Sequence, residues 1–84
     1  MTREMHIKRL LYQSSHRGCK ETDMILGNFA SKYLNQLTDA ELDLYENFIN
    51  LNDWDIYAWV IGSEKLPDEH DNKISRMVVE SLGV

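Results

Sequence analysis

The sequence predicts an all-α protein, a compact five-helix bundle in which residues 1–84 form a single domain. The first reason is that apolar residues recur at the i, i+3, i+4 spacing of a helix along almost the whole chain, with little strand-like alternation. The second is that short polar breaks separate five such stretches, as in helix bundles with short connections. The third is the length, because 84 residues are enough for only one domain.

The first helix is expected at about residues 2–13, where one stripe of its surface is apolar. That stripe consists of Ile7, Leu10, Leu11 and Ser14. A break follows over residues 14–18, in which the serines are expected to cap the next segment. Gly18 can adopt a backbone conformation there that other residues resist.

The second helix is expected at about residues 19–35. Gly27 lies inside it and costs about 1 kcal/mol relative to alanine, which predicts that another helix approaches closely at this point. A capping box formed by Thr38 and Glu41 marks the start of the third helix, which continues to about residue 51.

The fourth helix is expected at about residues 53–61, capped by Asn52 or Asp53 and stopped by Gly62. Its predicted core face consists of Ile56, Tyr57, Val60 and Ile61, with Trp59 nearby. After the loop at 62–67, Pro67 and Asp68 are expected to begin the last helix at about residues 68–82, and Gly83 to end it.

The composition is that of an ordinary globular protein with a net charge of −5. Residues 1–20 are an exception, because they hold five basic residues and one acidic residue. The overall charge argues against a nucleic-acid-binding domain. No apolar run is long enough to insert into a membrane, and no targeting segment is recognised. We therefore expect a cytoplasmic protein of a bacterium, with a processed organellar protein as the alternative.

The residues that usually carry catalysis do not form a recognisable set. His6, His16 and His70 fall on three separate predicted elements, and Cys19 is the single cysteine, so neither a metal site nor a disulfide is predicted. No glycine-rich phosphate loop is present, so the chain has no sequence motif for binding the pyrophosphate of a dinucleotide. We predict that the protein is not an enzyme.

One short segment has an unusual arrangement of charges around a glycine, Arg17-Gly18-Cys19-Lys20-Glu21-Thr22-Asp23. Arg17 and Glu21 are four residues apart, so they would be neighbours on a helix. A surface ion pair of this kind contributes only about 0–1 kcal/mol. From spacing alone, a helix start with a solvated ion pair is the simpler interpretation.

In its context, this segment resembles the motif of the succinate dehydrogenase flavinylation factors, which are called succinate dehydrogenase assembly factor 2 in mitochondria and FAD assembly factors in bacteria. The resemblance covers nearly the whole chain. Outside the motif it rests on Arg9-Leu10-Leu11-Tyr12, Ile25-Leu26-Gly27, Phe29, Leu37-Thr38, Glu41-Leu42, Asp55-Ile56-Tyr57-Ala58-Trp59-Val60, Gly62 and Pro67. The departures from the usual pattern are His16, Cys19, Thr22 and Trp54.

The resemblance implies a chaperone-like factor that binds the flavoprotein subunit of succinate dehydrogenase and promotes the covalent attachment of FAD to that subunit. Fumarate reductase is a further candidate client. The bond forms in the client's own site, so no cofactor is expected to be bound tightly by this chain. A monomer is the expected oligomeric state.

The resemblance also implies the residues that bind the partner. Arg17 is expected to donate a charged hydrogen bond to the client, and Gly18 to allow the turn or a close backbone approach. Glu21 is expected to contact the client or to orient Arg17. Asp23 is either a contact or a structural cap. Additional contacts are expected from His16, Lys20, Lys8 and Arg9.

A second interpretation stays open. The chain is then a small regulatory protein, similar to an antitoxin, that acts on a partner without flavin. Co-purification of a flavoprotein separates the two interpretations. Trp59 and Tyr57 are interpreted first as core residues under both.

Overall fold

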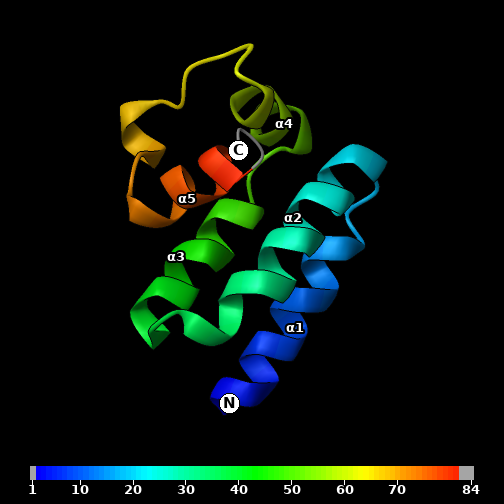
Figure 1. The fold of residues 1–84 in the computed structure, drawn as a ribbon, viewed down its shortest axis with the longest axis vertical. Helices are drawn as coiled ribbons and strands as arrows, with labels where there is room; N and C mark the ends of the chain where they lie inside the picture. Colours follow the sequence, from blue (N-terminus) through cyan, green and yellow to red (C-terminus); the bar gives the residue numbers. More distant parts are fainter. Residues whose placement is uncertain (1, 82–84) are drawn as a thin grey trace.

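The computed structural model describes residues 2–81, which form five α-helices and two short 3-10 turns, with no strand in this part of the chain (Figure 1). The all-α prediction and the five-helix prediction are confirmed. The helices are α1 (Arg3–Ser15), α2 (Lys20–Tyr33), α3 (Asp39–Ile49), α4 (Asp53–Ile61) and α5 (Lys73–Ser81). The 3-10 turns are η1 (Leu34–Gln36) and η2 (Asp68–His70).

The helices are arranged around one core, to which every helix contributes. α1 packs along α2 and also contacts α3, while α4 and α5 lie together at the end of the bundle away from the start of α1 (Figure 1). One fully buried side chain from each helix illustrates this: Leu10, Leu26, Leu42, Ile56 and Ile74. Burying such side chains is the main source of stability in a chain this short.

A buried hydroxyl pair joins α1 to α3 inside this core. The Ser14 Oγ lies 2.7 Å from the Leu10 carbonyl and 2.6 Å from the Tyr45 Oη. Either hydroxyl can be the donor across this contact, because Ser14 can also donate to the Leu10 carbonyl and Tyr45 can also donate to the Leu26 carbonyl at 3.4 Å. Burial raises the pKa of Tyr45 to about 12, against the lowering effects of Ser14 and Arg17. The phenol of Tyr45 therefore stays protonated near neutral pH.

The end of α1 differs from the prediction. The helix continues to Ser15, and the hydroxyls of Ser14 and Ser15 donate back to carbonyls one turn earlier in α1. They therefore do not cap α2, whose N-cap is Cys19 without a side-chain hydrogen bond. The close approach predicted at Gly27 is confirmed, because a Cβ there would lie 3.4 Å from the Ser15 Cβ.

The middle of the chain follows the sequence signals closely. The capping box of Thr38 and Glu41 is present at the start of α3, although α3 ends at Ile49 rather than near residue 51. Asn52 caps α4 by accepting the Trp54 N–H at 2.8 Å. Gly62 ends α4 in the left-handed conformation, with φ of 84°.

The last helix begins later than predicted. Pro67 and Asp68 lead only into η2, and α5 begins at Lys73 after a second break. Asn72 causes this restart, because its Oδ1 accepts the N–H groups of Ile74 and Ser75. The predicted end at Leu82 and Gly83 lies outside the described residues.

The predicted faces of α4 are confirmed in part. Trp59 is buried in the core as expected, and Tyr57 is half-buried. The assignment of Ile61 to the core is wrong, because its side chain is 49% exposed. Ile61 is the last residue of α4, where the helix passes into the loop at Gly62. Within residues 2–81, no helix has both the length and the apolar character needed to cross a membrane.

Candidate partner-binding site

The candidate site begins at the sharp turn between α1 and α2, formed by His16, Arg17, Gly18 and Cys19. Gly18 has φ of +103°, a conformation that side chains rarely allow. A Cβ at Gly18 would have no atom within 4 Å, so the glycine is required by the backbone turn and not by crowding. Of the two roles expected for Gly18, the structure shows the turn that positions Arg17.

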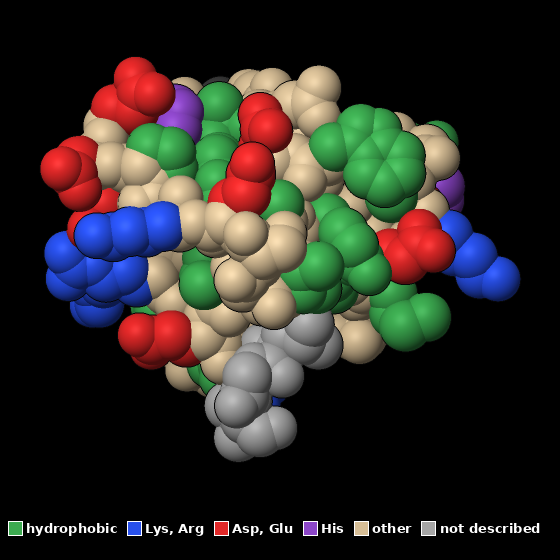
Figure 2. Space-filling view, turned by 90° about the horizontal axis from the view of Figure 1, so that it is seen from above, with side chains coloured by type: hydrophobic (Ala, Val, Ile, Leu, Met, Phe, Trp, Pro, Cys, Tyr) green, Lys and Arg blue, Asp and Glu red, His purple; other side chains and the backbone are tan. Residues whose placement is uncertain are grey.

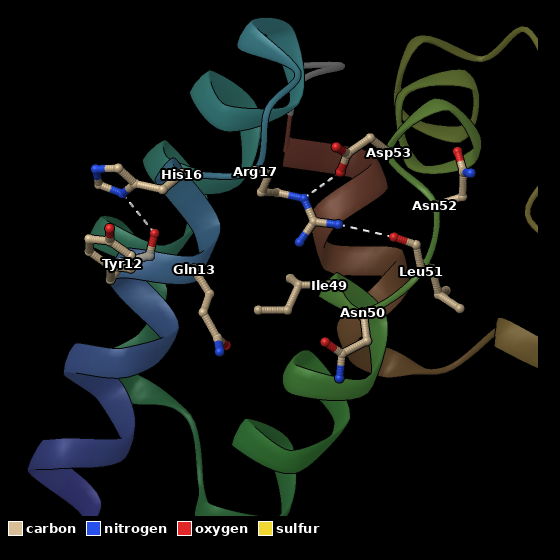
Figure 3. A pocket seen from close by; sticks show the side chains of 9 residues that line it. All are labelled: Tyr12, Gln13, His16, Arg17, Ile49, Asn50, Leu51, Asn52 and Asp53. Carbon is tan, nitrogen blue, oxygen red and sulfur yellow. Dashed lines mark hydrogen bonds and ion pairs between the residues drawn. The ribbon is translucent and has the colours of Figure 1, made fainter.

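Arg17 is held on three sides. Its Nε donates to the Asp53 Oδ1 at 2.5 Å, and its Nη2 donates to the Leu51 carbonyl at 3.0 Å (Figure 3). Its backbone N–H donates to the Asp23 Oδ1 at 2.6 Å. The side chain of Arg17 is only 11% exposed and that of Asp53 only 22%. The guanidinium is thus a fixed group between the turn and the connection from α3 to α4.

Glu21 does not pair with Arg17. Arg17 precedes α2, which begins at Lys20, so the helical spacing that would make the two neighbours does not apply. Glu21 is exposed, and the Cys19 thiol lies 3.5 Å from its Oε2. The counter-ion of Arg17 is instead Asp53, which the sequence suggested only as a cap for the fourth helix. No local signal marks this pair, because 36 residues separate its members.

Asp23 has the structural role that the sequence left as one of two options. Its carboxylate accepts the Arg17 N–H and so closes the turn from the side of α2. His16 stacks on Tyr12, with ring centroids 4.0 Å apart and planes 10° from parallel. Its Nδ1 lies 2.9 Å from the Tyr12 carbonyl oxygen, which fixes the stack at the end of α1.

The basic residues of α1 lie along the helix from this turn. Arg9 is six residues before Ser15, the last residue of α1, roughly 9 Å along the helix. Its Nη2 donates to the Glu46 Oε1 at 2.7 Å. Lys8 is exposed, with its Nζ 4.0 Å from the Glu4 carboxylate. Lys20 is exposed at the start of α2. Arg17, Gly18, Asp23 and His16 are therefore brought together, whereas Arg9 and Lys8 form a separate surface.

His6 joins that separate surface and lies near two carboxylates. His6, Asp43 and Glu46 place their ligand atoms within 4.8 Å of one another. The hydrogen bond from His6 and the charge of Arg9 lower the pKa of Glu46. Because the guanidinium of Arg9 already occupies the same Oε1 as His6, it supplies the positive charge that a metal ion would bring. His6, Arg9 and Glu46 thus form a hydrogen-bonded network between α1 and α3.

A groove of about 470 Å³ opens beside Arg17, between the last turns of α1 and the connection from α3 to α4 (Figure 3). Its lining residues are Tyr12, Gln13, His16, Arg17, Ile49, Asn50, Leu51, Asn52 and Asp53. Sequence reasoning missed Gln13 and Asn50, because a single amide on a helix surface has no distinguishing pattern.

Exposed apolar side chains lie at the same end of the bundle. They are Trp54 and Ile61 of α4 and Met24 of α2. Figure 2, which views the molecule from this end, shows several hydrophobic areas between acidic and basic side chains. Trp54 is 69% exposed and follows Asp53 directly, so the departure from the family pattern noted at this position does not disturb the core.

Comparison with known proteins identifies the family. A family model described as the flavinator of succinate dehydrogenase matches residues 8–81, which include the turn and the groove. The chain belongs to the flavinator family. The resemblance found in the sequence is confirmed, and so is the connection of this family with succinate dehydrogenase assembly.

Relatives of this flavinator family member carry the same kind of name. Succinate dehydrogenase assembly factor 2, mitochondrial, of Scheffersomyces stipitis is 46% identical over 94% of the chain, and that of Culex quinquefasciatus is 46% identical over 88%. Assembly factor 2-B of Drosophila mojavensis is 42% identical over 89%. The chain spans 56%, 48% and 49% of these relatives' own lengths. All three relatives are described as mitochondrial, so the bacterial cytoplasmic location stays a prediction.

Proposed function

We propose that the chain is an assembly factor that binds the flavoprotein subunit of succinate dehydrogenase and promotes covalent attachment of FAD to it, without a catalytic group of its own. The observation that supports this proposal is the flavinator match over residues 8–81, which contain the Arg17–Gly18 turn. The names of the relatives agree, since they describe assembly of succinate dehydrogenase. Tight binding of free FAD is not part of the proposal.

The geometry of the turn suits a factor that binds one conformation of its client. Arg17 is fixed by Asp53, Leu51 and Asp23 before any partner arrives, so little side-chain freedom is lost on binding. A factor of this kind favours flavin attachment only as far as it binds the reactive conformation of the client better than the others. A rigid surface makes that discrimination stronger than a mobile one.

Glu21 is the residue of the motif that is most available to a partner. Its side chain is exposed, and the contact it makes with the Cys19 thiol is weak. Arg17 and Asp23, in contrast, already have partners within the turn. We therefore assign the direct contacts of the motif's exposed charges to Glu21 and its neighbour Lys20. Gly18, Asp23 and the bonded N–H groups of Arg17 shape the surface.

The proposal is tested by co-expressing the chain with a succinate dehydrogenase flavoprotein subunit in cells that lack their own factor. Flavin fluorescence of that subunit on a denaturing gel reports covalent FAD. Wild type is expected to restore the fluorescence, while Gly18→Arg and Glu21→Ala are expected to lose most of it. Glu64→Ala, an exposed glutamate in the loop after α4, is the matched control. Circular dichroism verifies that each variant is folded.

The same experiment separates the remaining alternatives. A fumarate reductase flavoprotein subunit, used as a second client, shows whether the activity extends to that enzyme. Wild type that restores no fluorescence and co-purifies with no flavoprotein would contradict the proposal. The regulatory interpretation without flavin would then be favoured. Sedimentation of the purified chain tests the proposed monomer.

A further inference from the structure

The groove beside Arg17 has no unpaired Lys, Arg, Asp or Glu side chain in its lining. Arg17 and Asp53 are its only Lys, Arg, Asp or Glu lining residues, and they pair with each other at 2.5 Å. A phosphate or a nucleotide would therefore meet no unpaired Lys or Arg among the residues of this groove. The ligand that fits is uncharged and polar.

The groove does retain free hydrogen-bonding capacity. Gln13 from α1 and Asn50 from the end of α3 extend into the space between these elements, and no hydrogen bond joins either amide to another residue of the groove (Figure 3). Arg17 has five N–H donors, and its contacts with Asp53 and the Leu51 carbonyl use one on Nε and one on Nη2. The groove thus offers two carboxamides and further guanidinium N–H groups on a fixed frame.

A carboxamide has the same donor and acceptor groups as a peptide bond. Gln13 and Asn50 can each donate to a backbone carbonyl and accept from a backbone N–H, whatever the side chains of the ligand are. Most backbone groups of a helix or a paired strand are already hydrogen-bonded, so an extended, unpaired segment suits these amides best. The Tyr12 ring, which is 65% exposed and stacked on His16, gives such a segment a flat wall.

We propose that this groove binds an extended, uncharged stretch of polypeptide through its backbone, with Gln13, Asn50 and the remaining N–H groups of Arg17 as the hydrogen-bonding partners. The inference rests on the proposed function, because the segment is taken to belong to the flavoprotein subunit. It adds a second contact region beside Glu21. Recognition of the partner through this groove does not depend on charge.

The test uses a double variant, Gln13→Ala with Asn50→Ala, and a matched control, Gln36→Ala with Asn47→Ala. All four side chains are exposed, and Gln36 and Asn47 lie outside the groove. Dissociation constants for the complex with the flavoprotein subunit are measured by biolayer interferometry at about 50 mM and about 500 mM NaCl. We expect the double variant to bind about tenfold more weakly, or about 1.4 kcal/mol, at both salt concentrations. The control is expected to bind like wild type.

Two results would overturn the inference alone. One is a double variant that binds like the control while wild type restores flavin attachment. The other is a loss of affinity that disappears at high salt, since that would mean charged recognition. A wild-type chain that neither binds the subunit nor restores fluorescence would overturn the proposed function, and the inference with it.

Discussion

Arg17 and Asp53 are joined by a hydrogen bond of 2.5 Å between Nε and Oδ1, although 36 residues separate them in the chain. Arg17 belongs to the turn after α1, and Asp53 is the first residue of α4. The pair therefore connects the motif that defines the candidate site to the start of α4. Because both side chains are largely shielded from water, this contact is stronger than an exposed ion pair.

The Arg17–Asp53 pair predicts a specific loss of stability. We expect Asp53→Asn to lower the free energy of unfolding by about 2 kcal/mol, since it weakens a hydrogen bond between charged groups that are poorly exposed. Asp55→Asn is the control, because Asp55 is an exposed acidic residue in the same first turn of α4. Urea unfolding followed by circular dichroism measures both. Equal stability of the two variants would show that the pair contributes little.

Gly18 is expected to be sensitive to any side chain. Gly18→Ala should lower stability by about 1–3 kcal/mol, because alanine is strained at φ of +103°. Gly27→Ala serves for comparison, since Gly27 lies within α2 without a positive φ and a methyl there makes ordinary contact with Ser15. Thermal unfolding of both variants checks the difference. The explanation fails if alanine is tolerated equally at the two sites.

The hydroxyl pair between Ser14 and Tyr45 predicts an asymmetry. Ser14→Ala leaves the buried Tyr45 hydroxyl with only the Leu26 carbonyl at 3.4 Å, so we expect a loss of about 1–3 kcal/mol. Tyr45→Phe should cost less, because Ser14 still donates to Leu10. Denaturant titration of both single variants and the double variant measures this. A larger loss for Tyr45→Phe than for Ser14→Ala would contradict this asymmetry.

Glu46 predicts a pH dependence of stability. His6 and Arg9 lower the pKa of Glu46 below its ordinary value of 4.5 in the folded chain. The stabilisation of the folded chain by ionised Glu46 is therefore complete above about pH 4.5. It is lost as the pH falls through the lower pKa that Glu46 has in the folded chain. We expect Glu46→Gln to be less stable than wild type near pH 7 and to converge with it in acid. Glu64→Gln is the control. The free energies of unfolding of wild type and both variants are compared from pH 7 into the acid range.

Much of the fold was predictable because its signals are local. The apolar stripes, the Thr38–Glu41 capping box and the Gly62 stop each act within one or two turns of helix. The box and the stop were found where the sequence placed them, and the stripes were correct apart from positions such as Ile61. The errors in the helix boundaries also have local causes. The hydroxyls of Ser14 and Ser15 donate to carbonyls of α1 and do not cap α2. Asn72 caps a new helix after Pro67, so the last helix begins later than predicted.

The sequence alone determined the helical class, the family and the position of the motif between the first two helices, because periodicity and residue order carry that information. Only the tertiary structure decided which residues meet at the site. It gave Arg17 the distant Asp53 as its partner in place of nearby Glu21, and it placed Gln13 and Asn50 across one groove. These contacts depend on how α1 packs against α3 and α4, and the spacing of residues within one helix does not specify the geometry between helices.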